Sequence, residues 1–451
     1  MRSPPCGTSC SEDNGVEIGK YLNKGLWGLA DKALPVAYGV AYVLLVIRVL
    51  PDEEFGNFVL IQEVFLAISA LATAFALQPL LKFASEARRD DTGVVSASFL
   101  LHGIFIVVSS LLVVAFAGPA ADVLNSAGLA PLLRLVPAML AASLFRNFTM
   151  ALLQAEFRIR EVFWMDALHF LGTPFLVWVV SRLHQFDTAL DLVYINIISL
   201  SCSSIAGVWF ARKWLPETLQ RPGGGMERVW HFGKYSFGTT VSTMFSTKAD
   251  SFILSAFTGP VQVAVYNSAK VFVRIYEMMN QVVQMFVLPA ASRLSSQGEG
   301  GSLKVMTEKA ILFLTVGLLP VTAVFLLFPD TLVGILYGGR YVEAAGILRV
   351  FSLLTFVVPL SAVGMNILMG LGHVRALFIL NLQILVASLV AFALCIPRGE
   401  ALGAGIGYVA AATFGAIVAG RTLAKYVPFT AGEVFLRLRD ITGFLRKQFR
   451  H

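Results

Sequence analysis

Long apolar stretches alternate with short polar connections along almost the whole chain. About twelve of these stretches reach the roughly 20 residues that a helix needs to cross the hydrocarbon core of a bilayer. They lie at 22–48, 56–82, 94–117, 131–156, 161–182, 189–211, 232–258, 262–291, 307–328, 344–371, 375–396 and 402–424. The pattern therefore predicts an all-α polytopic membrane protein with about twelve transmembrane helices.

Lysines and arginines are concentrated in every second connection between these stretches. One set of connections holds about 24 of them, and the opposite set about 5, namely Arg48, Arg134, Arg182, Arg340 and Arg398. Because positive charge keeps a loop in the cytoplasm, the bias predicts that both termini are cytoplasmic. The polar first residues lack the basic-then-apolar order of a cleaved signal peptide, so we expect the first stretch to stay in the membrane.

The composition favours a membrane protein and argues against several other classes. Hydrophobic residues make up 57% of the chain and charged residues 14%, against about 25% charged in soluble domains. The net charge of +7 is spread over the connections, which argues against a surface for nucleic acid. The four cysteines, Cys6, Cys10, Cys202 and Cys395, show no metal-binding or redox spacing. We therefore expect no metal and no cofactor.

An internal repeat relates the fourth and the tenth apolar stretch. Residues 132–160 align without a gap with residues 347–375, so that Arg134 coincides with Arg349, and Arg160 with Arg375. Chance similarity between apolar helices is the alternative, but the aligned arginines mark the same membrane faces. Repeats separated by six spans keep their orientation, so we expect a pseudo-two-fold axis along the membrane normal.

The repeat predicts two six-helix lobes that face one another across a central cavity. We expect a disordered cytoplasmic N-terminus at 1–19, an N-lobe with helices 1–6 at 20–211, a cytoplasmic inter-lobe loop at 212–231, a C-lobe with helices 7–12 at 232–424, and a basic amphipathic cytoplasmic tail at 425–451. Apolar residues at helical spacing with bases between them are typical of a helix on the anionic inner leaflet. A regulatory or partner-binding tail is the alternative.

Ionisable residues lie inside several predicted spans, where each costs about 2.5–3.5 kcal/mol or more unless it faces a cavity or a partner. The deep cations are Arg146, Lys248, Lys270 and Arg274, and the accompanying groups are Asp31, Lys32, Glu63, Asp166, Asp250 and Glu277. Lys270, Arg274 and Glu277 follow i, i+4, i+7 spacing, which predicts that they share one helix face. One glutamate cannot neutralise both cations.

Two interpretations of these charges stay open. In the first, the four cations line the central cavity and bind an anionic ligand, and a pyrophosphate suits such a cluster of arginine and lysine. The intramembrane carboxylates then take up H⁺ or Na⁺. In the second, the charges pair internally, for example Lys248 or Arg274 with Asp250 or Glu277, and only lock helices together.

No nucleotide-hydrolysing motif accompanies these charges. The phosphate-binding pattern G-x-x-x-x-G-K-[ST] occurs nowhere in the sequence. Any energy must therefore come from an ion gradient or from consumption of the cargo on the far side of the membrane. A secondary transporter is the class that this indicates.

One segment resembles a known family. Residues 248–297 read KADSFILSAFTGPVQVAVYNSAKVFVRIYEMMNQVVQMFVLPAASRLSSQ. This stretch resembles the polysaccharide transporter family, the O-antigen and exopolysaccharide flippases of the multidrug/oligosaccharidyl-lipid/polysaccharide exporter superfamily. The residues that match the family's loose motifs are Asp250, Gly259, Tyr266, Ala269, Leu288 and Pro289. The segments LPDEEFGNFVLIQ (50–62) and ILYGGRYVEAAGILRV (335–350) are similar to two further stretches of the family.

The resemblance implies a flippase of the bacterial inner membrane without catalytic residues. Its implied cargo is undecaprenyl-pyrophosphate-linked oligosaccharide for O-antigen, capsule or exopolysaccharide biosynthesis, moved by alternating access of two lobes about a cationic cavity. The implied partners are this lipid-linked substrate, membrane lipids, H⁺ or Na⁺, a polysaccharide polymerase and a chain-length regulator. Nucleic acid is not among them.

Three other classes have to be weighed against a flippase. A multidrug or cation antiporter of the same superfamily shares the twelve helices, but its cavity should be acidic. A major-facilitator sugar symporter should carry Gly-x-x-x-Asp-Arg-x-Gly-Arg-Arg between helices 2 and 3, where this chain reads KFASEARRDD. A membrane glycosyltransferase would use Asp52, Glu53 and Glu54 to bind a metal, but it normally adds a large external domain. A solvated acidic turn explains these three residues more simply.

Overall fold

The computed structural model describes residues 50–86, 92–126, 128–156, 158–183, 188–215, 223–297, 300–429 and 431–436, together with isolated positions between Trp27 and Val46. Within these residues, all regular structure is helical and no strand occurs. The predicted all-α class is therefore confirmed.

The helices follow the predicted spans closely. In the first half of the chain they are α2 (Asp52–Ala72), the π-helix η2 (Thr73–Leu77), α3 (Gln78–Glu86), α4 (Thr92–Val123), α5 (Leu129–Leu133), α6 (Val136–Ala155), α7 (Ile159–Phe170), α8 (Gly172–Leu183) and α9 (Ala189–Ala211). In the second half they are α11 (Gly225–Thr258), α12 (Pro260–Lys270), the 3₁₀-helix η3 (Val271–Val273), α13 (Arg274–Ser296), α14 (Gly300–Leu327), α15 (Pro329–Tyr337), α16 (Ala344–Phe351), α17 (Leu354–Gly370), α18 (Val374–Ala424) and α19 (Ala431–Leu436).

Seven helical segments in the described chain are long and apolar enough to cross a membrane, and the pair α16 and α17, bent by 49°, makes an eighth. The chain is thus a multi-pass membrane protein. Helix α18 has 51 residues and contains Glu400 at φ 47° and ψ −128°. At about 1.5 Å per residue it would be far longer than the ~30 Å core of a bilayer. The break at Glu400 separates it into the two spans predicted at 375–396 and 402–424.

The full count of about twelve helices stays a prediction. The first predicted span, 22–48, lies largely outside the described residues. Helix α11 and the run from α12 to α13 have spanning length, but they are not among the segments that are apolar enough. Several of the polar residues of these helices belong to the candidate functional site, which is described below.

The chain folds into two compact units. Unit 1 holds Val64–Ala117 and Pro131–Gly238, with the described positions before Pro51, and unit 2 holds Pro51–Glu63, Gly118–Ala130 and the described residues from Thr239 onward. Helices α2, α4, α5 and α11 each pass from one unit into the other. The six-helix lobes divided at 212–231 remain a prediction, and α11 begins inside that predicted loop, at Gly225.

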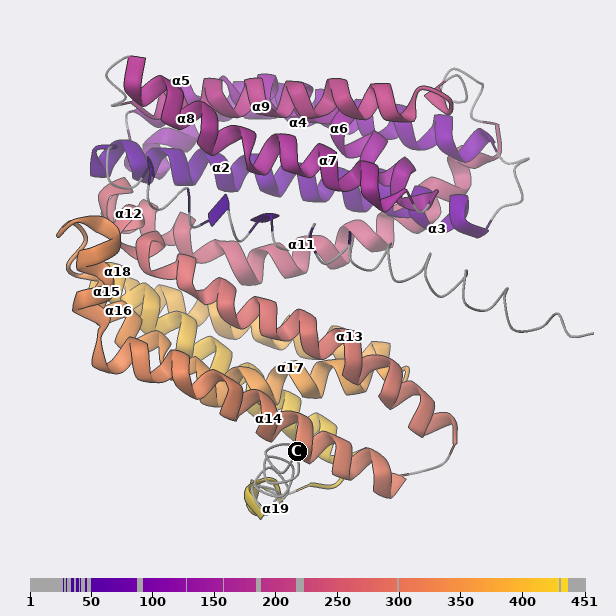
Figure 1. Ribbon diagram of the computed structural model, residues 1–451, viewed down its shortest axis with the longest axis vertical. Helices are drawn as coiled ribbons and strands as arrows, with labels where there is room; N and C mark the ends of the chain where they lie inside the picture. The colour runs from indigo at the N-terminus through magenta and orange to yellow at the C-terminus, as the bar shows by residue number, and fades with distance from the viewer. Residues whose placement is uncertain are drawn as a thin grey trace, which may run out of the picture. The chain divides into compact units, whose positions relative to one another are not determined.

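In unit 1, α6 packs against α9, α7 and α3 (Figure 1). Its buried residues include Phe148 and Leu152, which join a core with Met165 of α7. Helix α9 lies close to α6 and α7 at Gly207, which has no side chain. A Cβ at this position would lie 2.3 Å from Thr149 Oγ1 of α6 and 2.6 Å from Met165 Cε of α7. The helices are therefore close enough for short polar side chains to reach across.

In unit 2, α17 packs against α18, α13 and α14, and α12 packs against α16 and α18 (Figure 1). Helix α12 begins at Pro260, directly after Gly259 at φ 82°. Helix α15 ends at Tyr337, and the next residue, Gly338, has the left-handed conformation. A proline at the first position and a left-handed glycine after the last are ordinary helix boundaries.

The described start of the predicted cytoplasmic tail packs on unit 2. Helix α19 contacts α14, where Lys304 Nζ lies 2.6 Å from Glu433 Oε1. Val434 is buried in the core that α13, α14 and α17 share. The rest of the predicted amphipathic tail, from residue 437 on, lies outside the described residues.

Candidate functional site

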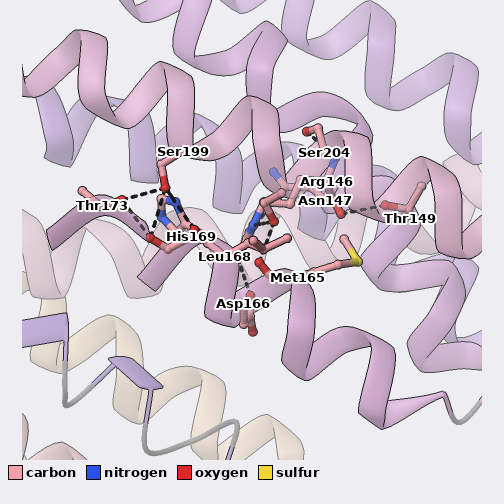
Figure 2. A network of polar contacts seen from close by, with 11 residues as sticks. Arg146, Asn147, Thr149, Met165, Asp166, Leu168, His169, Thr173, Ser199 and Ser204 are labelled. Carbon is pink, nitrogen blue, oxygen red and sulfur yellow. Dashed lines mark hydrogen bonds and ion pairs between the residues drawn. The ribbon is translucent and has the colours of Figure 1, made fainter. Parts of the chain in front are cut away.

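Arg146 of α6 forms an ion pair with Asp166 of α7 inside unit 1. Both side chains are only 11% exposed. The guanidinium Nε also donates to Ser203 Oγ of α9 at 3.1 Å. Figure 2 shows Arg146 among the polar residues that surround it. Such a buried pair costs desolvation, but removing one partner leaves an uncompensated charge that costs about 3–5 kcal/mol.

The serines of α9 complete this network. Ser204 Oγ accepts the backbone N–H of Arg146 at 3.1 Å and donates to the carbonyl of Ala142. Ser203 Oγ donates to the carbonyl of Met165 at 2.7 Å. The contacts tie α6, α7 and α9 together. An anionic ligand of Arg146 would have to compete with Asp166 for its guanidinium.

A second polar cluster in unit 2 surrounds Asp250 of α11, whose side chain is 1% exposed. Lys270 Nζ and the hydroxyl of Tyr266, both from α12, each lie 2.6 Å from Asp250 Oδ2. The backbone N–H of Ser251 donates to Asp250 Oδ1 at 2.8 Å. Both carboxylate oxygens therefore have partners, and the charge of Lys270 is balanced where it lies.

Lys248 pairs with Glu63, which lies on the part of α2 that belongs to unit 2. The Nζ–Oε2 distance is 2.8 Å, with Lys248 32% exposed and Glu63 buried. Another pair in the same unit joins Arg340 to Asp52 at the start of α2. Three of the four predicted cavity cations thus meet a carboxylate, as the second interpretation of the sequence allows.

Arg274 and Glu277 are arranged differently from Lys270. Their side chains, on the first turns of α13, are exposed. The 3₁₀ turn Val271–Val273 separates them from Lys270, which faces Asp250. A 3₁₀ turn has three residues per turn instead of 3.6. Residues before and after it therefore do not share the helix face that regular α-helical spacing predicts. Among the four predicted cations, Arg274 is therefore the exposed one. Asp31 and Lys32 lie outside the described residues.

Sequence reasoning did not single out Tyr266, Ser203 or Ser204 as partners of these charges. Tyr266 precedes Lys270 by four residues and so shares its helix face, a signal that the sequence contains. Ser203 and Ser204 are short polar residues in an apolar helix, and no spacing sets them apart from the other serines of α9.

Residues 45–346 match the sequence model of a family described as "Polysaccharide biosynthesis protein". This range is most of the chain, and the protein belongs to that family. A protein of Methanocaldococcus jannaschii, described as an uncharacterized membrane protein, is 26% identical over 149 residues. The match spans 33% of this chain and 29% of the length of that curated relative.

Solved structures of transporters share the fold. The lipid II flippase MurJ in an inward closed conformation matches with a TM-score of 0.72 at 12% identity, over 91% of this chain and 89% of that one. An inward-facing multidrug resistance transporter of the MATE family, from the MOP superfamily, has a TM-score of 0.69 at 15% identity, over 88% and 94%. A MOP superfamily transporter of Pyrococcus furiosus, with a binding pocket described as reversed in polarity, has 0.62 at 16%, over 89% and 94%. The resemblance seen in the sequence to a polysaccharide family is confirmed by the family match, and the likeness to these solved transporters shows a shared fold.

Proposed function

We propose that the protein is a flippase that moves undecaprenyl-pyrophosphate-linked oligosaccharide across the bacterial inner membrane for polysaccharide biosynthesis. The observation that carries the proposal is its membership of a polysaccharide biosynthesis family on the fold of MATE and MurJ transporters. It has no chemistry of its own in this scheme and works by alternating access, with both termini cytoplasmic. A polymerase and a chain-length regulator would act on the product.

Arg274 is the residue to which we assign the pyrophosphate. Its guanidinium is exposed on a helix that is too polar to face lipid on all sides, and a guanidinium binds phosphate oxygens in a bidentate manner. Arg146, Lys248 and Lys270 can bind the pyrophosphate only if each of them breaks its ion pair with a carboxylate and pairs with a phosphate oxygen instead. Their partners Asp166, Glu63 and Asp250 are then the groups that take up H⁺ or Na⁺, with Glu277 beside Arg274.

Replacing Arg274 with alanine tests this assignment. We expect Arg274→Ala to lower translocation of the lipid-linked oligosaccharide at least about tenfold, the equivalent of one charge-assisted hydrogen bond of ~1.5 kcal/mol or more, with insertion and yield unchanged. Arg274→Lys should retain part of the rate because it keeps the charge but loses the bidentate geometry. The measurement is protection of the sugar from an external glycosidase in proteoliposomes, with and without an ion gradient.

Glu53→Ala is the control, because Glu53 is an exposed acidic residue of the first turn of α2 and should not affect the rate. Normal transport by Arg274→Ala would refute the assignment of the pyrophosphate to this side chain.

A multidrug antiporter is the second candidate, and the ion pairs favour it. Since Arg146, Lys248 and Lys270 each meet a carboxylate, the surroundings of each cation are less positive than the sequence alone suggests. Uptake of small organic cations by the same proteoliposomes, with no movement of lipid-linked oligosaccharide, would identify this class.

A further inference from the structure

Helix α4 carries a histidine, His102, inside one of the segments that are apolar enough to cross a membrane. Its side chain lies in unit 1 and is 0% exposed. Neither Nδ1 nor Nε2 has a hydrogen-bond partner among the residues that the structure describes. A buried polar group left unpaired costs about 1–3 kcal/mol, so a ring with two such atoms calls for an explanation.

Two buried hydroxyls accompany this ring. Ser98 precedes His102 by four residues on α4, and Ser69 precedes Ala72 by three residues on α2, so each pair shares a helix face. The carbonyl of Ala72 is close enough to the imidazole to interact with it. In the described part of unit 1, the buried side-chain nitrogen and oxygen atoms without a hydrogen-bond partner all belong to Ser69, Ser98 and His102. The unmet hydrogen-bonding capacity of this unit is therefore gathered around one imidazole.

The backbone next to this cluster is irregular. The π-helix η2 begins at Thr73, directly after Ala72. The ring of Phe75 in η2 lies against that of Phe105, which follows His102 by three residues, with centroids 6.0 Å apart. Single π-helical turns are rare and are frequent at functional sites. The irregular turn thus packs on the segment of α4 that carries the histidine.

No charged side chain of the described residues balances this imidazole. The parts of α2 and α4 that belong to unit 1 contain no acidic or basic residue other than His102. None of the titratable groups on the other helices around α4 acts on the ring, namely Lys82 of α3, Arg146 of α6, and Glu227, Arg228, His231, Lys234 and Tyr235 of α11. Because a buried charge without a counter-charge costs several kcal/mol, the ring is neutral in this conformation.

We propose that His102 is a proton-binding group of the transport cycle, with the hydroxyls of Ser69 and Ser98 as its hydrogen-bond partners when the proton is bound. The inference rests on the proposed function and identifies H⁺ as a coupling ion. Imidazole is the side chain that gains and loses a proton near neutral pH. A protonated imidazole donates from both nitrogens, and the two hydroxyl oxygens and the carbonyl of Ala72 are acceptors for these bonds.

Proton binding at His102 is coupled to conformation because the charged ring needs surroundings that the neutral ring does not. A bound proton favours a conformation in which water and the hydroxyls reach the ring, and its release favours the conformation described here. The proton comes from water on one side of the membrane and returns to water on the other side. The imidazole is thus unchanged after each cycle, as alternating access requires.

The paired carboxylates are less suited to this task than His102. Asp166 and Asp250 each lie in an ion pair, and an opposite charge nearby favours the ionised form of a carboxylate. Each would have to leave its cation before it takes up a proton. At His102 the proton competes with no cation, and its cost is the opening of a buried site.

The first test measures protonation directly on the purified full-length protein. Carbon-13 NMR of the histidine rings follows each signal with pH, and His102→Gln identifies the signal of His102 by its loss. We expect this signal to titrate between about pH 5 and 8. Ser98→Ala should shift the midpoint of this signal and leave the other histidines unchanged, which also identifies it if His102→Gln does not fold. A ring that keeps its neutral signal throughout this range would overturn the proposal.

The second test measures translocation of the lipid-linked oligosaccharide in proteoliposomes with and without a pH gradient. We expect the gradient to accelerate the wild type, and His102→Gln to transport at one rate in both conditions. His231→Gln is the matched control, because His231 is an exposed histidine of the same unit, and it should keep the acceleration.

The outcomes separate this site from the proposed function. Transport by the wild type that ignores the gradient, or acceleration that survives in His102→Gln, would overturn the role of His102. If the wild type moves no cargo in either condition, the proposed flippase function fails. The NMR titration, which needs no cargo, then still decides whether His102 binds a proton.

Discussion

Asp166→Ala is expected to lower the free energy of unfolding by about 3 kcal/mol or more, because it removes a buried carboxylate that forms an ion pair with Arg146. The two side chains form an ion pair with 11% exposure each. Ser203 can still accept a hydrogen bond from the guanidinium after the substitution. We therefore expect a loss at the lower end of the about 3–5 kcal/mol that removing one partner of a buried ion pair costs. Thermal unfolding in detergent, followed by tryptophan fluorescence, measures the loss.

The control for this prediction is an exposed pair. Asp330 and Arg349 form an ion pair on the surface of unit 2, with side chains 63% and 49% exposed, and such pairs contribute about 0–1 kcal/mol. Asp330→Ala should therefore leave the unfolding temperature nearly unchanged. If Asp166→Ala behaves like Asp330→Ala, the buried pair does not hold α6 and α7 together.

A double variant separates packing from transport. Replacing both partners with apolar residues, as in Arg146→Met with Asp166→Leu, removes the stranded charge and should recover most of the stability. A double variant that is stable and transports normally would assign the pair to packing alone. One that is stable but inactive would show that Arg146 or Asp166 takes part in transport, as the sequence suggests.

The sequence predicts the helices of this protein better than it predicts the partners of their charges. Hydropathy gives the spans because a bilayer demands a fixed length of apolar helix, and even the break in α18 at Glu400 falls between two predicted spans. Arg146 and Asp166 are recognisable as costly groups from their depth alone. That they pair with each other depends on the rotation of α7 against α6, which hydropathy does not encode.

Helical spacing in the sequence also gives a wrong prediction of shared faces where the helix is irregular. The i, i+4, i+7 pattern predicts one face for Lys270, Arg274 and Glu277. The 3₁₀ turn Val271–Val273 lies between the first and the second of them, and Lys270 faces Asp250 while the others are exposed. Nothing in the apolar sequence Val-Phe-Val marks that turn.

Gly56→Ala is expected to destabilise unit 2 by about 3 kcal/mol, the upper part of the range for overpacking. Gly56 lies in α2, and a Cβ there would be 1.9 Å from the carbonyl oxygen and 2.5 Å from the carbonyl carbon of Pro260. Both are backbone atoms at the start of α12, so no side-chain rotation relieves the clash. The approach of α2 to α12 therefore requires a residue without a side chain.

Gly103→Ala is the matched control, because Gly103 also lies inside a helix and a Cβ there meets nothing within 4 Å. Exchanging a helical glycine for alanine should stabilise by about 0.5–1 kcal/mol, so the two variants are expected to shift the unfolding temperature in opposite directions. An unchanged unfolding temperature for Gly56→Ala would mean that α2 is free to move away from Pro260. The Asp52–Arg340 and Glu63–Lys248 pairs would then hold this end of α2 without help from backbone packing.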